Sequence, residues 1–419
     1  MNSKYFISAA ALAATAVGYA DLDMDRENGI KIGSRMTLKP YVSLSYTYDS
    51  NVDSTKHSRS GSQWVVDPGL ELEYLAENWK LEGAVWYQYH AYDHYSSQMD
   101  SSSYGERLKF DWADSKPNEP GWRVLLAERF EQISQDDDMS NHGGRGYGRD
   151  RKQFTAEGAI ERRLNERWHA DANASYYLLD YKNDVEKYGS LFGWKRAVAG
   201  GEVGYMASNY LDLLVAGNYQ WYWQDNDTEY TPGTASRRGN RIRSNSRGWS
   251  VMGGVATRAT DKLTYKLLTG WSRFEYGNGT KDIDGWTYQL SGDWQIDEQN
   301  TMHLMALGSS YYQPSEYEYG SAIKVYNFSL GFAKGFIRNK LKGVVDLAYR
   351  KETHEYVEYA ADDYDSDIWT ARFGLSYRIN RIVSVFGRIE YQTRMCSGVP
   401  NHAYDYDRWR GTVGLKLTY

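Results

Sequence analysis

Two histidines and an aspartate lie close together at one point of the sequence, at His90, Asp93 and His94. An aspartate beside a histidine can orient the imidazole as a general base, so a hydrolase could use this combination. Polar segments carry His and Asp routinely, however, and spacing alone does not define a catalytic site. We therefore predict that the chain is not an enzyme and has no catalytic residues.

The sequence also contains little that indicates a metal site. The chain has no His-Glu-x-x-His segment, and its one cysteine, Cys396, excludes a paired-cysteine site. Acidic residues cluster at 136–138 and 362–367, but neither spacing matches a calcium-binding EF-hand loop. We expect no metal site and no cofactor.

The other charged residues alternate with apolar ones. In the last segment, 407–419, Trp409 and Leu415 fall on one side of an extended strand, while Arg410 and Lys416 fall on the other. A helix would mix the two kinds. A final strand with an apolar face leaves an unpaired edge, and pairing with the first strand removes that edge.

The same two-residue alternation recurs along the chain, in about 18 segments of about ten residues each. Short turns and long polar connections alternate between these segments, and most of the 15 tryptophans lie near segment ends on the apolar side. The 38 tyrosines and only 7 prolines also favour strands. The sequence predicts an all-β fold, an antiparallel transmembrane β-barrel of about 18 strands (16 being the alternative), with short periplasmic turns and long extracellular loops.

The N-terminus reads as an export signal. Lys4 precedes an apolar run at 6–17, and Gly18-Tyr19-Ala20 offers small residues for cleavage. We predict a signal peptide at 1–20, a short periplasmic segment at 21–40, and the barrel at 41–419. The expected location is the bacterial outer membrane. The formal net charge of −6 argues against a nucleic-acid partner.

A short stretch near the N-terminus carries a family resemblance. It consists of Gly29-Ile30-Lys31-Ile32-Gly33, Pro40, and the segment from Tyr46 to Val52. The chain resembles the β-barrel porin family associated with exopolysaccharide gene clusters. Outside these segments, the chain resembles the family in its barrel architecture and not in identifiable motifs. The resemblance implies an outer-membrane barrel with a transport role and without catalytic residues.

Side chains cannot fill the interior of a barrel of 16–18 strands, so the lumen-facing residues carry the functional information. The bases predicted to face the lumen are Lys342, Arg372, Arg378, Arg388, Arg410, Lys416, Arg107, Lys109 and Arg129. The acids predicted to face it are Glu157, Glu161, Asp171, Glu202 and Asp212. The two sets either face each other as opposed walls that create a transverse field, or form lateral salt bridges, for example Arg388 with Glu390.

These features predict a porin-like channel for passive passage of small hydrophilic solutes through a charged lumen. The first alternative is an export channel for an exopolysaccharide, in which Trp86, Tyr177 and Tyr311 could stack on sugar rings. The second is a structural or adhesin barrel plugged by its own loops. Expected partners are outer-membrane lipid and lipopolysaccharide, together with a small solute or a polysaccharide. The sequence does not determine the oligomeric state.

Overall fold

The structure is a computed structural model. It describes residues 29–52, 59–93, 100–114, 120–136, 149–181, 193–225, 245–260, 262–276, 282–297, 302–314, 321–337, 340–356, 364–398 and 405–419. The predicted signal peptide, His94 and most of the predicted long loops lie outside these residues. No described segment is a helix of the length and hydropathy that a membrane crossing requires.

The described residues form one short strand and eighteen long ones. The long strands have 13 to 16 residues, more than the ten or so expected from the sequence. The strands are β1 (Ile30–Ile32), β2 (Met36–Asp49), β3 (Gly61–Leu75), β4 (Trp79–Tyr92), β5 (Ser101–Ala113), β6 (Gly121–Asp136), β7 (Arg149–Arg163), β8 (Trp168–Tyr181), β9 (Gly193–Ser208), β10 (Leu211–Asp225), β11 (Ser246–Thr260), β12 (Leu263–Tyr276), β13 (Ile283–Asp297), β14 (Met302–Pro314), β15 (Ser321–Phe336), β16 (Leu341–Tyr356), β17 (Tyr364–Arg378), β18 (Val383–Ser397) and β19 (Tyr406–Thr418).

The alternation of side chains follows the predicted register. In β19, Trp409, Val413 and Leu415 are exposed on the outer side, while Thr418 is buried on the inner side. Exposed apolar side chains recur at alternate positions of the other long strands except β14, whose side chains are outside what the structure describes, and lipid rather than water can cover them. This outer surface is called lipid-facing below, and the inner one lumen-facing.

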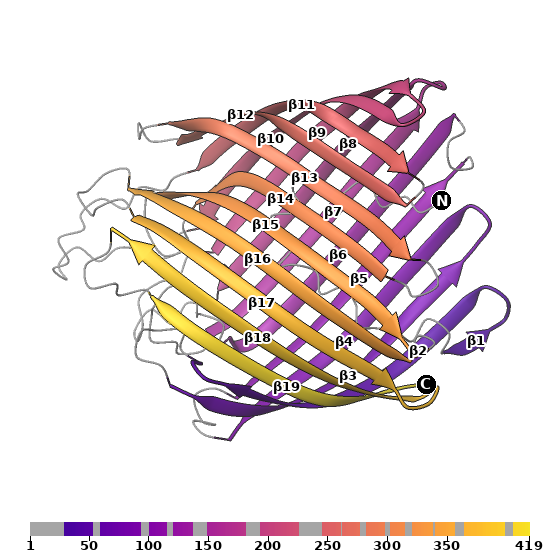
Figure 1. The fold of residues 1–419 in the computed structure, drawn as a ribbon, viewed down its shortest axis with the longest axis vertical. Coiled ribbons are helices and arrows are strands. Elements are labelled where there is room, and N and C mark those ends of the chain that lie inside the picture. The colour runs from indigo at the N-terminus through magenta and orange to yellow at the C-terminus, as the bar shows by residue number, and fades with distance from the viewer. Residues whose placement is uncertain are drawn as a thin grey trace.

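The sheet closes on itself. Each long strand pairs antiparallel with the next in the sequence, including β9 with β10. The last strand then pairs with the first, with Arg410 opposite Asp49 and Thr418 opposite Tyr41. Figure 1 shows the tilted strands arranged around one cylinder. The prediction of an 18-stranded antiparallel barrel is confirmed.

Strand β2 begins five residues earlier than the barrel predicted from the sequence, at Met36 instead of residue 41, and runs through Pro40. Pro40 is tolerated because it lies where the β19 ladder ends, and its carbonyl accepts the last bond, 3.0 Å from the Tyr419 nitrogen. Beyond that point, β1 pairs with residues 36–38 of β2. Strand β1 therefore covers an edge of β2 that β19 is too short to reach.

Tryptophan placement also agrees with the prediction. All but Trp86 and Trp194 lie on the lipid-facing side of their strands. Near the short connections, Trp79 stacks on Tyr74 with 4.8 Å between ring centroids. Near the long connections, Trp369 packs 4.5 Å from Tyr349. Rings at both ends of the strands are typical of the two membrane boundaries.

The lumen-facing side of β10–β12 is tightly packed. Leu214, Met252 and Leu268 form a buried apolar cluster. Beside it, Gly254 lies so close to β12 that an added Cβ would overlap the carbonyl oxygen of Leu267. Gly270 meets the carbonyl of Val251 in the same way. Only glycine permits this approach, which brings β11 and β12 close together on the lumen side.

We expect Gly254→Ala to destabilise the barrel by about 1–3 kcal/mol, because a backbone carbonyl cannot move aside as a flexible side chain would. Urea unfolding in detergent micelles, followed by tryptophan fluorescence, measures the change. Gly411→Ala is the matched control, since nothing lies within 4 Å of an added Cβ there. Equal unfolding midpoints for the two variants would contradict the expectation.

Candidate functional site

A row of alternating charges runs around the lumen across the strands that close the barrel. Asp346 of β16 lies opposite Arg372 of β17, which lies opposite Glu390 of β18. Glu390 in turn lies opposite Arg410 of β19, and Arg410 lies opposite Asp49 of β2. We call these five residues the closing row. Each has an oppositely charged neighbour across the strand pair, an arrangement that stabilises a sheet.

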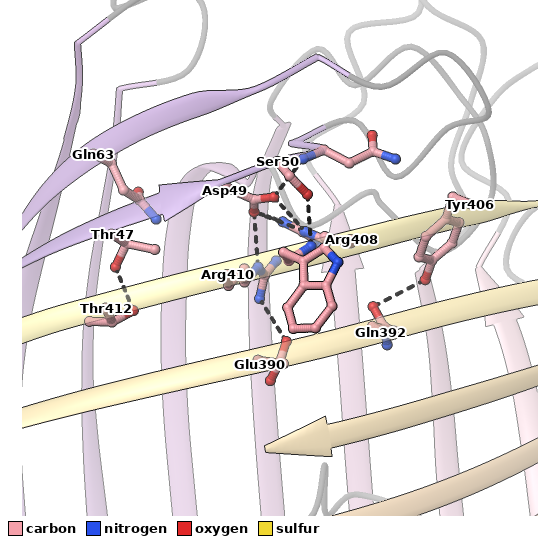
Figure 2. A network of polar contacts seen from close by, with 12 residues as sticks. Thr47, Asp49, Ser50, Gln63, Glu390, Gln392, Tyr406, Arg408, Arg410 and Thr412 are labelled. Carbon is pink, nitrogen blue, oxygen red and sulfur yellow. Dashed lines mark hydrogen bonds and ion pairs between the residues drawn. The ribbon is translucent and has the colours of Figure 1, made fainter. Parts of the chain in front are cut away.

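The contacts in this row are short. Arg372 Nε lies 2.5 Å from Glu390 Oε2, and Arg410 Nε lies 2.9 Å from Asp49 Oδ2. Arg408 also binds Asp49, because its Nε and Nη2 atoms donate hydrogen bonds to Oδ2 at 2.8 Å and 2.5 Å. Figure 2 shows Arg408 and Arg410 converging on Asp49 from β19, with Glu390 beyond them on β18.

The bases of the closing row are therefore held in lateral salt bridges, one of the two arrangements that the sequence left open. The pair named from the sequence, Arg388 with Glu390, lies within a single strand, whereas the pairs of the closing row join neighbouring strands. Directly opposite residues are closer together than residues two apart on one strand, which explains the difference. Lys342, Arg378, Arg388 and Lys416 lie on the same lumen-facing side of β16–β19 and are partly buried.

The predicted acidic residues lie on the lumen-facing side of β7–β10, and several have basic partners there. Glu202 Oε2 lies 2.5 Å from Lys266 Nζ, and Glu161 Oε2 lies 3.8 Å from Arg123 Nη1. Asp212 contacts His169 at 3.7 Å. The Asp171 Oδ1 atom accepts a hydrogen bond from Asn173 at 3.3 Å, and Glu157 lies opposite Ala127 and Ser175.

The sequence interpretation missed Lys266 as a partner of this wall. Lys266 belongs to β12, and two strands separate it from Glu202 on β9. Ala216 lies directly opposite Glu202 and Ala256 lies directly opposite Lys266, so neither charge has a large side chain opposite it on that neighbouring strand. No local signal in the sequence marks this pairing, because it depends on the register of β9 to β12.

Strands β5 and β6 form a different kind of wall. Arg107 lies directly opposite Arg129, and both side chains are water-exposed, at 61% and 58%. In contrast, the side chain of Arg372 in the closing row is 18% exposed. Lys109, two residues from Arg107, is also exposed. We call Arg107, Lys109 and Arg129 the open basic wall.

This wall carries two counter-charges. Arg107 Nη2 lies 3.5 Å from Glu71 Oε1, and Arg129 Nη2 lies 3.2 Å from Glu131 Oε2. Glu82, opposite Lys109, lies 2.6 Å from Lys80 instead. Exposed pairs of this kind are weak, since water screens them, so the arginines keep much of their capacity to bind an anion.

The three residues proposed for sugar stacking lie apart. Trp86 of β4 packs on Gly105, and the Arg129 guanidinium lies 5.5 Å from its ring centroid. Tyr177 of β8 instead packs 4.5 Å from the buried Trp194. Tyr311 lies in β14 opposite Val325, and its side chain is outside what the structure describes.

Tyr177 begins a row of lumen-facing rings. Trp194 lies 5.9 Å from Tyr222, and Tyr222 lies 5.4 Å from Phe274. Tyr222 and Phe274 are fully buried. This row thus packs the wall from β8 to β12, whereas the Trp86 ring beside the open basic wall is only half-buried.

The described residues offer no group of three or more His, Cys, Asp and Glu side chains positioned to hold a metal ion. His90 is hydrogen-bonded through Nδ1 to Gln63 at 3.0 Å. Asp93 accepts a hydrogen bond from the Tyr46 hydroxyl at 3.4 Å. Both side chains are thus engaged in hydrogen bonds between strands or at a strand end. That the chain has no metal site and no catalytic residues remains a prediction.

Comparison with known proteins gives one family match. The model of the family described as "Putative beta-barrel porin 2" matches residues 26–419. A search of curated proteins found no match.

Solved structures with a similar arrangement of strands include two receptors from Pseudomonas aeruginosa. The siderophore receptor PirA is 9% identical, with 91% of this chain and 80% of that chain covered and a TM-score of 0.45. A point mutant of the ferric enterobactin receptor PfeA is 11% identical, with 93% and 81% covered and a TM-score of 0.46. A structure titled bacterial polysaccharide outer membrane secretin is 8% identical, with 91% and 98% covered and a TM-score of 0.36. At these values the likenesses carry no information about function.

Proposed function

The chain belongs to the family described as putative beta-barrel porin 2, and it is an outer-membrane β-barrel channel; from this premise we propose that it passes small hydrophilic solutes passively. In this proposal the charged lumen is the selectivity element, as rings and walls of charge are in other channels. Residues 1–20 are proposed to direct the export that this location requires.

One observation supports the proposal most directly, namely the contrast between the lumen walls. In the closing row, the charged side chains form close ion pairs. In the wall of β9–β12, Lys266 pairs closely with Glu202, and apolar side chains pack together. The open basic wall of β5 and β6 leaves two arginines more than half exposed. A solute path lined by exposed guanidinium groups attracts anions and repels cations.

Planar-bilayer recording tests this function. We expect the purified chain to give stepwise conductance, with a reversal potential in a salt gradient that favours anions. The double variant Arg107→Gln and Arg129→Gln should shift that potential toward cations, because two positive charges leave the path.

Arg273→Gln is the matched control. Arg273 is a 45% exposed arginine on the lipid-facing side of β12, where it contacts Asp282 at 2.5 Å. This variant should keep the reversal potential of the parent chain. A closed barrel without conductance would contradict the proposal and favour the loop-plugged alternative. Conductance with identical potentials in all three proteins would remove the open basic wall as the selectivity element.

Export of an exopolysaccharide is a second candidate, favoured by Trp86 beside the open basic wall. Aromatic faces bind sugar rings, and exposed bases suit an acidic polymer. Adding oligosaccharides during the same recordings separates the candidates, because a channel that guides sugars is blocked by them and a general porin is not.

A further inference from the structure

We propose that Trp86, Arg107 and Arg129 form one binding site for an acidic sugar unit, such as a uronate residue, on the lumen wall of β4–β6. The inference rests on the proposed channel function, since it names the class of solute that pauses in the lumen. The sequence pointed to a stacking residue and to a basic wall separately, and the structure places them together.

The first argument is the opposition of two arginines. Arg107 and Arg129 are direct cross-strand neighbours, a position where like charges repel and destabilise a sheet. Glu71 contacts Arg107 and Glu131 contacts Arg129, so each of these carboxylates pairs with one of the two arginines. A carboxylate that bridges both guanidinium groups would relieve the repulsion and accept charge-assisted hydrogen bonds.

The balance of charge also leaves room for an anion. The open basic wall has three bases, and its two contacting acids are Glu71 and Glu131. Lys109 lies two residues along β5 from Arg107 on the same lumen-facing side. One further negative charge neutralises the group. Both arginines are exposed, so an anion reaches them from the lumen, and Arg129, which lies over the Trp86 ring, moves aside when a sugar stacks there.

The second argument is the position of Trp86. Gly105, opposite Trp86, has no Cβ and so lets the indole lie against the wall; a side chain there would overlap the ring. The Arg129 guanidinium lies over the indole as a cation–π partner, 5.5 Å from the ring centroid, so a carboxylate bound to Arg129 is held next to the ring. An apolar ring beside a cation matches a uronate, which has an apolar ring face beside a carboxylate. A bare anion such as phosphate would use only the arginines.

Lys416 also lies over a lumen-facing ring, 5.0 Å from the centroid of Tyr41, but its cross-strand neighbours are Ser43 and Ser384, so no second base lies opposite it. Two further places that hold a base or rings are buried. Arg394 lies at the ring-rich end of β18, but it is 1% exposed and contacts Glu352 at 3.6 Å. The ring row from Tyr177 to Phe274 includes Tyr222 and Phe274, which are fully buried. Binding at either place requires the wall to open first.

Current block in planar bilayers tests the proposal with defined probes. Glucuronate, glucose and inorganic phosphate are added in turn to the full-length channel, and the half-blocking concentration of each is measured. We expect glucuronate to block at a concentration at least about tenfold lower than glucose or phosphate. A charge-assisted hydrogen bond or a stacking contact each supports a difference of this size.

Variants separate the two halves of the site. Trp86→Ala should raise the half-blocking concentration of glucuronate about tenfold and leave that of phosphate unchanged. Arg107→Gln with Arg129→Gln should raise both. The conservative Trp86→Phe should restore most of the glucuronate block. Retention of the folded band on unheated gels shows that each variant still forms the barrel.

Two results overturn the inference while the channel proposal stands. One is equal block by phosphate and glucuronate with no effect of Trp86→Ala, which indicates a plain anion site. The other is equal block by glucose and glucuronate. If the chain gives no conductance at all, the channel proposal fails instead, and glucuronate binding is then measured by tryptophan quenching of the barrel in detergent. Absence of quenching there also overturns the site.

Discussion

Replacing Asp49 with alanine is expected to lower the free energy of unfolding of the barrel by about 3–5 kcal/mol, the usual effect of removing one member of a buried ion pair. Asp49 is 6% exposed at the seam where β2 meets β19. Arg408 and Arg410 both bind its carboxylate, and the Asn51 backbone nitrogen donates to it at 2.9 Å. Without the carboxylate, the buried Arg408 loses its strongest counter-charge.

We expect the decrease in the free energy of unfolding to be larger at the seam between β2 and β19 than elsewhere in the barrel. Residues 49 and 408 are distant in the sequence, so their contact joins the first and last strands of the barrel directly. Urea unfolding of the chain in lipid vesicles, followed by tryptophan fluorescence and by heat-dependent gel mobility, measures the effect. Asp49→Asn keeps one accepting oxygen and should lie between the parent chain and Asp49→Ala.

Asp365→Ala is the matched control for Asp49→Ala. Asp365 contacts Lys351 at 3.1 Å, and both side chains are more than a third exposed. Removing an exposed pair should change the free energy of unfolding by less than about 1 kcal/mol. If the two alanine variants unfold at the same urea concentration, the closing row does not stabilise the seam.

Leu108→Arg on β5 is expected to destabilise the membrane-inserted barrel by about 2–4 kcal/mol, the cost of placing arginine on the lipid-facing side near the middle of the bilayer. Leu108 is exposed on that side. It lies midway along β5 between Tyr104 and Trp112, the aromatic residues at the two ends of its outward face. Glu128 lies directly opposite Leu108 on that side and can pair with the new arginine, but the pair stays within the bilayer, because the arginine cannot reach either boundary without bending the strand or drawing water into the bilayer.

The adjacent position supplies the control. Lys109→Arg places the same side chain one residue further along β5, on the lumen-facing side, where water already reaches Lys109. Its effect on the free energy of unfolding should be within about 0.5 kcal/mol. The comparison uses refolding into lipid vesicles and gel mobility of the folded form. Equal stability of the two variants would contradict the assignment of inner and outer surfaces on which the fold and the lumen depend.

The secondary structure was predictable because a strand in a membrane obeys a rule that one sequence can express. Every second residue meets lipid, so the apolar positions of β19 and of the other strands identify both the strands and their outer face. The beginning of β2 was predicted less well. Its extension to Met36 depends on β1, a short strand whose pairing partner is not apparent from the residues alone.

The candidate site was predicted only in part. Arg107, Arg129 and Trp86 were identified as lumen-facing from their positions in the alternation. Their proximity depends on which residues lie opposite each other across β4, β5 and β6. Tyr177 was proposed for the same role as Trp86, yet it packs against Trp194, a residue of the next strand.

The sequence by itself predicted about 18 strands, and it determined the face that each presents to lipid and the kinds of side chain that line the interior, since these follow from a local two-residue period. Only the tertiary structure decided which charges neutralise one another. Asp49 and Arg408 meet because the barrel closes, Lys266 reaches Glu202 across β10 and β11, and Arg107 and Arg129 remain open to water. These contacts depend on register and curvature, which join residues far apart in the chain and leave no periodic signal in it.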